Sequence, residues 1–183
     1  MKYGNIFQLI SDVFQKAEVS CVTIGGFAVN HYQFSRATAD IDFMMVEEDF
    51  DKALPLLETA GCTLACRTSL FATLKAEVPP FIEVDILFID RKTLDGISKE
   101  GHTGEITGVK FIFPSLEHLI ASKLHAFKNN PVHREGRDLR DIIELIKQNK
   151  IDIRSESFHE LCLKYGNEEI YQKIKNILPW KKS

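Results

Sequence analysis

The chain has 183 residues, with 23 lysines and arginines against 26 aspartates and glutamates, so its formal net charge is −3. A hydrophobic share of 44% and a charged share of 27% are ordinary for a folded globular protein and exclude a disordered or fibrous chain. The near balance of charges also argues against a protein whose whole surface binds nucleic acid, although a local basic patch is compatible with it.

The first two thirds of the chain mix helical and strand patterns. Apolar residues at helical spacing predict a helix over 3–18, and a short buried strand over 20–24 follows and ends at Gly25-Gly26. In chain order we then expect a brief helix, a strand over 38–46, a helix over 47–61, strands at about 63–67, 70–76 and 81–89, and a hairpin that turns near Thr107-Gly108.

From Pro114 onward the pattern is helical only. Residues 115–127 and 134–148 show helical periodicity, and about 155–176 predicts one or two further helices. We therefore expect an α+β fold, a mixed α/β sheet with flanking helices, formed by a sheet domain over 1–113 and a C-terminal helical segment over 114–183 packed on it.

Neither a membrane segment nor a cysteine framework is visible. No stretch approaches the roughly 20 apolar residues of a membrane helix, and the first twenty residues lack a signal-peptide cleavage site. The spacing of Cys21, Cys62, Cys66 and Cys162 does not match a metal site. We expect a cytoplasmic protein with reduced thiols and no membrane partner.

Two aspartates stand two residues apart in the strand predicted over 38–46. Side chains alternate between the faces of a strand, so Asp40 and Asp42 project together, opposite Ile41 and Phe43. Adjacent carboxylates repel each other unless a cation lies between them, and Mg²⁺ favours carboxylates together with water and phosphate oxygens. The pattern therefore predicts a metal site, with a solvated acidic face as the alternative.

The strand predicted over 81–89 repeats this pattern. Glu83 and Asp85 face one way, and Val84 and Ile86 face the other. If the two acidic strands are neighbours, Asp85, or less favourably Glu83, adds a third carboxylate to the patch. Three carboxylates on adjacent strands suit two metal ions that activate a hydroxyl and stabilise a leaving pyrophosphate.

The glycine pair lies where the strand over 20–24 meets a helix. Glycines at such a turn let the backbone approach a ligand closely, and the N-terminus of a helix offers N–H groups to phosphate. Alone, a glycine pair such as Gly25-Gly26 usually indicates only a tight turn. Arg36 and Thr38, just before the first acidic strand, are further candidates for phosphate binding.

These motifs together resemble the nucleotidyltransferase fold of the DNA polymerase β superfamily, with the pattern nearest to AbiE-type toxins and small "minimal" nucleotidyltransferases. The resemblance rests on Gly25-Gly26, Arg36-x-Thr38-x-Asp40-Ile41-Asp42-Phe43 and Glu83-Val84-Asp85-Ile86. It implies that 1–113 is the catalytic domain, that Asp40, Asp42 and Asp85 bind two Mg²⁺ ions, and that Gly25 and Gly26 hold the triphosphate of an NTP. Many members have Ser directly after the glycines, where this chain has Phe27.

A lysine interrupts the apolar stripe of the helix over 115–127. Lys123 lies three and four residues from Ile120 and Leu119, on the face that we expect to be buried. Such a lysine either extends outward to solvent or meets an anion. The AbiE-like branch has a lysine in a similar segment, which implies that Lys123 is a catalytic residue that contacts a phosphate or a carboxylate. His125 lies opposite the stripe, so we expect it to be exposed.

Four charged residues gather on one side of the helix over 134–148. By spacing alone, Arg134, Arg137, Asp138 and Asp141 form a solvated face with ion pairs along the helix, which is the interpretation we favour. The segment also resembles the R-x-x-K-D-x-x-D signature of the AbiE-like branch, with Arg137 in the Lys position. That resemblance implies a role in function instead.

The resemblance implies a Mg²⁺-dependent nucleotidyltransferase that moves an NMP from an NTP to a hydroxyl acceptor and releases pyrophosphate. The acceptor that it suggests is tRNA or a protein side chain, modified by the toxin of a toxin–antitoxin pair whose partner is a cognate antitoxin. A small-molecule acceptor stays open. The alternative, favoured by Phe27, is a catalytically weak or inactive module with the same fold that binds nucleotide or protein.

Overall fold

The computed structural model describes residues 3–178 and divides the chain into two compact units. The first unit contains Met1–Ala28 and Arg36–Ser115, and the second contains Val29–Ser35 and Leu116–Ser183. Helix α2 (Gly25–His31) therefore begins in the first unit and ends in the second. Within residues 3–178, none of the helices combines the length and the hydropathy needed to cross a membrane.

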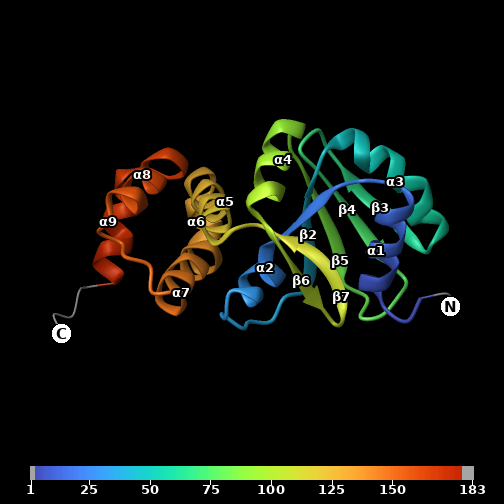
Figure 1. Ribbon diagram of the computed structural model, residues 1–183, viewed down its shortest axis with the longest axis horizontal. Helices are drawn as coiled ribbons and strands as arrows, with labels where there is room; N and C mark the ends of the chain where they lie inside the picture. The colour runs from blue at the N-terminus through green and yellow to red at the C-terminus, as the bar shows by residue number, and fades with distance from the viewer. Residues whose placement is uncertain (1–2, 179–183) are drawn as a thin grey trace. The chain divides into compact units, whose positions relative to one another are not determined.

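The first unit is built on a mixed five-stranded sheet (Figure 1). Its strands are β1 (Cys21–Ile24), β2 (Asp40–Met45), β3 (Cys62–Arg67), β4 (Phe71–Ala76) and β5 (Glu83–Phe88), in the spatial order β1-β2-β5-β4-β3. Strands β2 and β5 are parallel, and the other pairs of this sheet are antiparallel. A parallel pair requires a crossover, which here contains α3 (Glu47–Thr59), β3 and β4.

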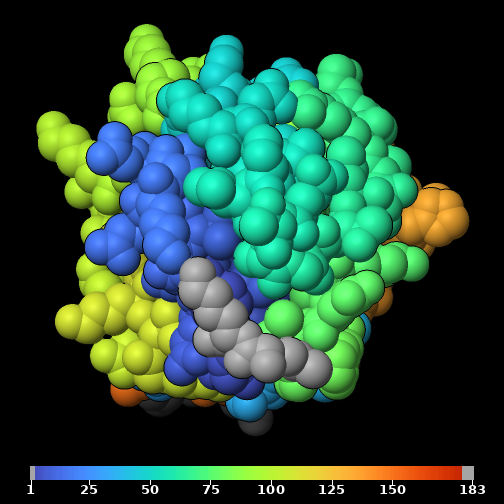
Figure 2. All heavy atoms as spheres, turned by 90° about the vertical axis from the view of Figure 1, so that its right-hand side faces the viewer, coloured from blue at the N-terminus to red at the C-terminus, as the bar shows by residue number. Residues whose placement is uncertain are grey.

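Helices α1 (Ile6–Lys16) and α3 cover one face of the sheet and lie side by side (Figure 2). Phe14 of α1 packs edge-to-face on Phe43 of β2, with ring centroids 5.5 Å apart. Phe50 of α3 packs on Phe88 of β5 at 5.4 Å. These apolar contacts fix the buried face of β2 and β5, so the residues that alternate with Phe43 and Phe88 project from the opposite face.

Helix α4 (Arg91–Glu100) packs on that opposite face at its β1 end. Its Leu94 and Ile97 form a buried cluster with Val22 of β1 and Met44 of β2. The sequence pattern did not predict this helix, because only two of its ten residues are buried apolar side chains. Its start does have a local signal, since the Asp90 carboxylate accepts a hydrogen bond from the Thr93 amide as an N-cap.

A separate hairpin of β6 (His102–Ile106) and β7 (Val109–Phe113) completes the first unit. Its turn residues Thr107 and Gly108 have φ of 51° and 80°, the positive pair that a two-residue hairpin turn favours. The predicted turn is confirmed. Within residues 3–178 no disulfide joins any of the four cysteines, Cys21, Cys62, Cys66 and Cys162.

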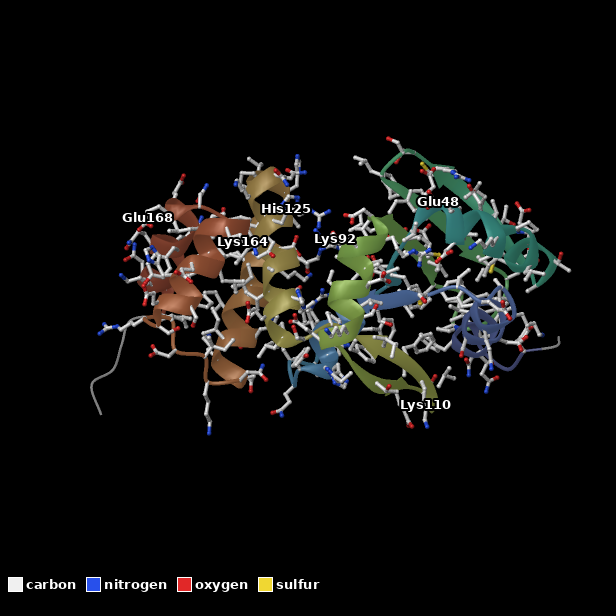
Figure 3. All side chains as sticks on the ribbon, turned by 45° about the horizontal axis from the view of Figure 1, so that its top comes forward. Glu48, Lys92, Lys110, His125, Lys164 and Glu168 are labelled. Atoms are coloured by element: carbon white, nitrogen blue, oxygen red, sulfur yellow. The ribbon has the colours of Figure 1, made fainter. Side chains whose placement is uncertain are left out.

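The second unit is helical. It contains α5 (Leu116–Asn129), α6 (Pro131–Arg134), a π-helical segment η1 (Glu135–Leu139), α7 (Arg140–Gln148), α8 (Glu156–Tyr165) and α9 (Glu168–Ile177). The helix predicted over 134–148 is therefore not one continuous α-helix, because its first turn is wound as η1. His125 of α5 is exposed, as its place on the helix predicted (Figure 3). Sheet and helices together confirm the predicted mixed α+β class.

Candidate active site

Three carboxylates meet on the sheet face opposite α1 and α3. In the parallel register of β2 and β5, Asp42 lies directly beside Asp85, and Asp40 lies two residues before Asp42 on the same face. One carboxylate oxygen from each aspartate lies within 4.8 Å of those of the other two, and all three residues are half-buried. In the same register Glu83 lies beside Asp40, but it is exposed, and its carboxylate lies 4.0 Å from Lys75 of β4 and outside the trio.

Two threonine hydroxyls hold the outer members of this carboxylate trio. Thr38 Oγ1 donates to Asp40 Oδ1 at 2.8 Å. Thr73 Oγ1, from β4, donates to Asp85 Oδ1 at 2.6 Å. Both donors are neutral, and within residues 3–178 neither Asp40 nor Asp85 forms an ion pair. Hydrogen bonds to a charged acceptor are the strong ones, so these contacts fix the orientation of both carboxylates.

The backbone at Gly25 and Gly26 lies very close to this trio and to Thr38, which is possible because glycine has no side chain. Gly25 has φ +63°, and a Cβ atom built on it would lie 1.7 Å from Asp42 Oδ2. A Cβ atom on Gly26 would lie 2.3 Å from Thr38 Oγ1 and 3.3 Å from Arg36 Nη1. Neither position accepts a side chain without displacing a group at the site. The structure thus brings together the four residues predicted to bind nucleotide.

Phe27, the departure from the family pattern after the glycines, has a packing role. Its ring meets the ring of Phe7 in α1 edge-to-face, with centroids 5.4 Å apart. A serine could not make this contact. The aromatic residue therefore anchors the turn that holds Gly25 and Gly26 against the first helix.

The donor set of the trio fits a hard divalent cation. Mg²⁺ takes oxygen ligands and is commonly bound by one or two carboxylates plus substrate phosphates and water. Side chains of Asp40, Asp42 and Asp85 supply such oxygens from two neighbouring strands, with solvent access. Clustered exposed carboxylates are also common without a metal.

A second charged cluster is buried in the helical unit. Lys123 Nζ of α5 lies 2.8 Å from Asp138 Oδ1 and 2.8 Å from Asp141 Oδ2, and Arg134 Nη1 lies 3.0 Å from Asp138 Oδ2. The side chains of both aspartates are only 1% exposed and that of Lys123 is 8% exposed. Burial raises the pKa of the Asp138 carboxyl, but Lys123 and Arg134 outweigh it, so this pKa lies below its usual range.

This cluster corrects the favoured interpretation of the helix over 134–148. Asp138 and Asp141 do not lie on a solvated face. They are buried because Lys123, from another helix, supplies the charge that makes their burial tolerable. Of the predicted ion pairs along the helix, Arg134 with Asp138 is present, whereas Arg137 is exposed. Lys123 does meet carboxylates, but they are Asp138 and Asp141 of its own unit and not those of the acidic strands, and its catalytic role stays a prediction.

Comparison with known families identifies the chain. The family described as nucleotidyl transferase AbiEii toxin, type IV toxin–antitoxin system, matches residues 9–179, a range that spans both units. The chain belongs to the AbiEii family. The resemblance predicted from the glycine turn and the acidic strands is confirmed, and family and fold together identify a nucleotidyltransferase. A comparison with curated proteins gave no match.

Solved structures share the fold of this AbiEii family member. An antigenic nucleotidyltransferase-like protein from Paracoccidioides brasiliensis is 19% identical, with a TM-score of 0.59, and the match covers 94% of this chain and 89% of that one. ANT(2″)-Ia in complex with adenylyl-2″-tobramycin is 12% identical, with a TM-score of 0.57, and the match covers 94% of this chain and 97% of that one. The lincosamide adenylyltransferase LnuA bound to lincomycin is 18% identical, with a TM-score of 0.52, and the match covers 76% of this chain and 99% of that one. At these identities the likeness shows the fold alone.

Thr73 is the residue at this site that the sequence analysis missed. It is the polar residue between buried Ala72 and Leu74 in β4, which marks a strand with one open face. That alternation was visible in the sequence. Its contact with Asp85 was not, because it depends on the antiparallel register of β4 and β5, in which Thr73 lies opposite Asp85.

Proposed function

We propose that this AbiEii family member is a Mg²⁺-dependent nucleotidyltransferase that transfers an NMP from an NTP to a hydroxyl acceptor. The observation that supports it best is the convergence of three carboxylate oxygens within 4.8 Å beside a glycine turn that closely approaches one of them. Three carboxylates on a mixed sheet, next to a turn without side chains, provide both a cation site and room for a triphosphate.

In this proposal Asp40, Asp42 and Asp85 hold up to two Mg²⁺ ions. When bound, the metal neutralises the triphosphate and lowers the pKa of the attacking hydroxyl. Asp85 faces the acceptor hydroxyl and takes up its proton as the oxygen attacks the α-phosphorus. A new P–O bond to the acceptor forms, the bond between the α-phosphorus and the oxygen that bridges it to the β-phosphate breaks, and pyrophosphate leaves.

The residues around the trio orient the nucleotide. The turn at Gly25 and Gly26 offers backbone N–H groups to the triphosphate, and Arg36 adds a positive charge beside Gly26. Thr38 is already hydrogen-bonded to Asp40, so its part is to orient that carboxylate as the nucleotide binds. With Phe27 in place of Ser, the turn offers one hydroxyl donor fewer to phosphate, whereas its backbone N–H groups do not depend on residue type.

We further propose that the protein is the toxin of a type IV toxin–antitoxin pair and that its acceptor is a tRNA. The family description supports the toxin role, and a toxin has to modify a component that the cell needs. A small molecule is the competing acceptor, because the ANT(2″)-Ia structure contains adenylyl-2″-tobramycin and the LnuA structure contains lincomycin. The NTP requirement places such an enzyme in the cytoplasm.

A transfer assay tests the proposal. The protein is incubated with Mg²⁺ and each of the four α-labelled NTPs, with and without total tRNA, beside the Asp42→Asn and Glu83→Gln variants. Glu83 is the matched control, because it is an exposed carboxylate on β5 that lies beside Asp40 in the strand register but outside the trio. We expect label transfer to RNA that EDTA and Asp42→Asn abolish and that Glu83→Gln leaves within about twofold.

Three outcomes would contradict parts of the proposal. A rise in melting temperature with NTP, but no transfer to any acceptor, would establish the binding module instead of the enzyme. Transfer that persists in Asp42→Asn would remove the carboxylate trio from the mechanism. Transfer to an added aminoglycoside or lincosamide, and not to tRNA, would keep the reaction and replace the acceptor.

A further inference from the structure

The hydrogen bond between Thr73 and Asp85 links a strand without any predicted site residue to the carboxylate trio. Thr73 lies directly opposite Asp85 in the antiparallel register of β4 and β5. Its Oγ1 donates to Asp85 Oδ1 at 2.6 Å, and Thr73 is half-buried. A half-buried hydrogen bond to a carboxylate is strong enough to select one orientation of the acceptor.

The orientation of the Asp85 carboxylate depends on this contact. Within the described residues the Thr73 hydroxyl is the hydrogen-bond donor to the Asp85 side chain, and no cation pairs with it. The carboxylates of Asp42 and Asp85 repel each other across adjacent strands. Without the Thr73 donor, Asp85 is free to rotate away from Asp42, which would separate the oxygens that now converge within 4.8 Å.

We propose that Thr73 is a positioning residue for metal binding: its hydroxyl holds Asp85 Oδ1 so that the carboxylate stays turned toward Asp40 and Asp42. This inference rests on the proposed Mg²⁺ site. Thr38 holds Asp40 in the same manner, through a hydrogen bond to Asp40 Oδ1. The two threonines thus pre-orient the outer ligands before a cation arrives, as hydrogen bonds to metal ligands commonly do.

Three variants separate this role from a packing role. Thr73→Val keeps the shape and the β-branch but removes the donor, and Thr73→Ser keeps the donor but removes the methyl group. Thr63→Val is the matched control, because Thr63 is an exposed strand threonine on neighbouring β3, where it pairs with Lys75 of β4. The measurements are Mn²⁺ binding to the protein without nucleotide, by the loss of the free-ion EPR signal, and the Mg²⁺ dependence of NMP transfer.

We expect Thr73→Val to weaken Mn²⁺ binding by about 10–100-fold, the usual effect of removing a hydrogen bond to a metal ligand. The Mg²⁺ concentration for half-maximal transfer should rise by a similar factor, while the rate at saturating Mg²⁺ falls less. Thr73→Ser should restore both values to within about threefold of the wild type. Thr63→Val should match the wild type.

The outcomes distinguish this inference from the proposed function. Mn²⁺ binding that is equal in wild type and Thr73→Val overturns the role of Thr73 and leaves the enzyme intact. Failure of Thr73→Ser to restore binding also overturns it, since a hydroxyl at this position would then not be sufficient to hold Asp85. A wild-type protein that neither binds Mn²⁺ nor transfers label rejects the proposed function, and the role of Thr73 with it.

Discussion

The two acidic clusters of this protein use the same carboxylate groups in opposite surroundings. Asp138 and Asp141 are almost completely buried, and each lies 2.8 Å from the Lys123 ammonium. Asp40 and Asp85 are half-buried and accept hydrogen bonds from neutral hydroxyls, with no ion pair within residues 3–178. The buried cluster contains its own cation, Lys123, because a buried unpaired charge is strongly unfavourable. Where the protein leaves carboxylates accessible, a cation from solution is able to complete the set.

Burial with an ion-pair partner therefore distinguishes structural carboxylates from carboxylates that we expect to be functional. Buried, internally compensated groups should govern stability, and accessible groups without an internal cation should govern activity. Mutations in the two clusters should therefore have effects that do not overlap.

The largest expected effect is on catalysis. Asp85→Asn should reduce NMP transfer by about a thousandfold or more, because a bound metal stabilises the transition state by several kcal/mol. The metal-free variant should be as stable as the wild type or slightly more stable, since one of three repelling charges is gone. Transfer assays and thermal melts with and without Mg²⁺ measure both quantities. A large loss of stability in the metal-free state would contradict the comparison.

The second prediction concerns Lys123. Lys123→Met should lower the free energy of unfolding by about 3–5 kcal/mol, because it removes the buried ammonium that both carboxylates share, while Arg134 remains paired with Asp138. Lys128→Met, an exposed lysine on the same helix, should change it by less than about 0.5 kcal/mol. Urea unfolding of both variants provides the measurement. A loss below about 1 kcal/mol for Lys123→Met would show that the buried cluster is not structural.

Acid should weaken the buried cluster. Burial raises the pKa of Asp138, but Lys123 and Arg134 lower it further, so its pKa in the folded protein lies below the unfolded value of about 3.9. The stability that this shift contributes is therefore complete above the unfolded pKa and is lost as pH falls through the lowered folded pKa. As pH falls below about 5 and through the lowered folded pKa, unfolding free energy should fall more steeply for wild type than for Asp138→Asn. Parallel curves would contradict this assignment.

The smallest expected effect comes from a buried polar group outside both clusters. Thr23 of β1 is completely buried, and its Oγ1 has no hydrogen-bond partner among the described residues. Replacing it with the isosteric Val should leave stability unchanged or increase it by up to about 1 kcal/mol, because an unsatisfied hydroxyl is removed from the core. Chemical denaturation measures the change. A loss of more than about 1 kcal/mol would mean that the hydroxyl has a partner after all.

The sequence predicted those features of the fold that depend on neighbouring residues in the chain, such as the faces of a strand and the position of a turn. The alternation of acidic and apolar residues in 40–45 and 83–88 predicted which side chains share a face of the sheet. The structure confirms this, since Phe43 and Ile86 are buried. The glycine pair reports a turn, and the structure gives Gly25 the left-handed φ that favours glycine there. These features follow from one strand or one turn at a time.

Features that depend on two distant elements were not predictable in the same way. A helical projection of 134–148 shows that Asp138 and Asp141 share a side, but it contains no information that Lys123 faces them from another helix. The projection also assumes one α-helix, whereas the π-helical first turn follows a different repeat. Thr73 was missed for the equivalent reason in the sheet, because strand register and not spacing brings it to Asp85.

The parallel pairing of β2 and β5 has a consequence for the order in which the site is made. Asp42 and Asp85 lie on neighbouring strands, but α3, β3 and β4 separate them in the chain. During synthesis from the N-terminus, a nascent chain that has emerged only as far as β4 has two of the three carboxylates and none of the strand that holds the third. Assembly of the carboxylate trio is thus tied to translation past Asp85, and a chain interrupted before that residue lacks the third carboxylate whichever other elements it folds.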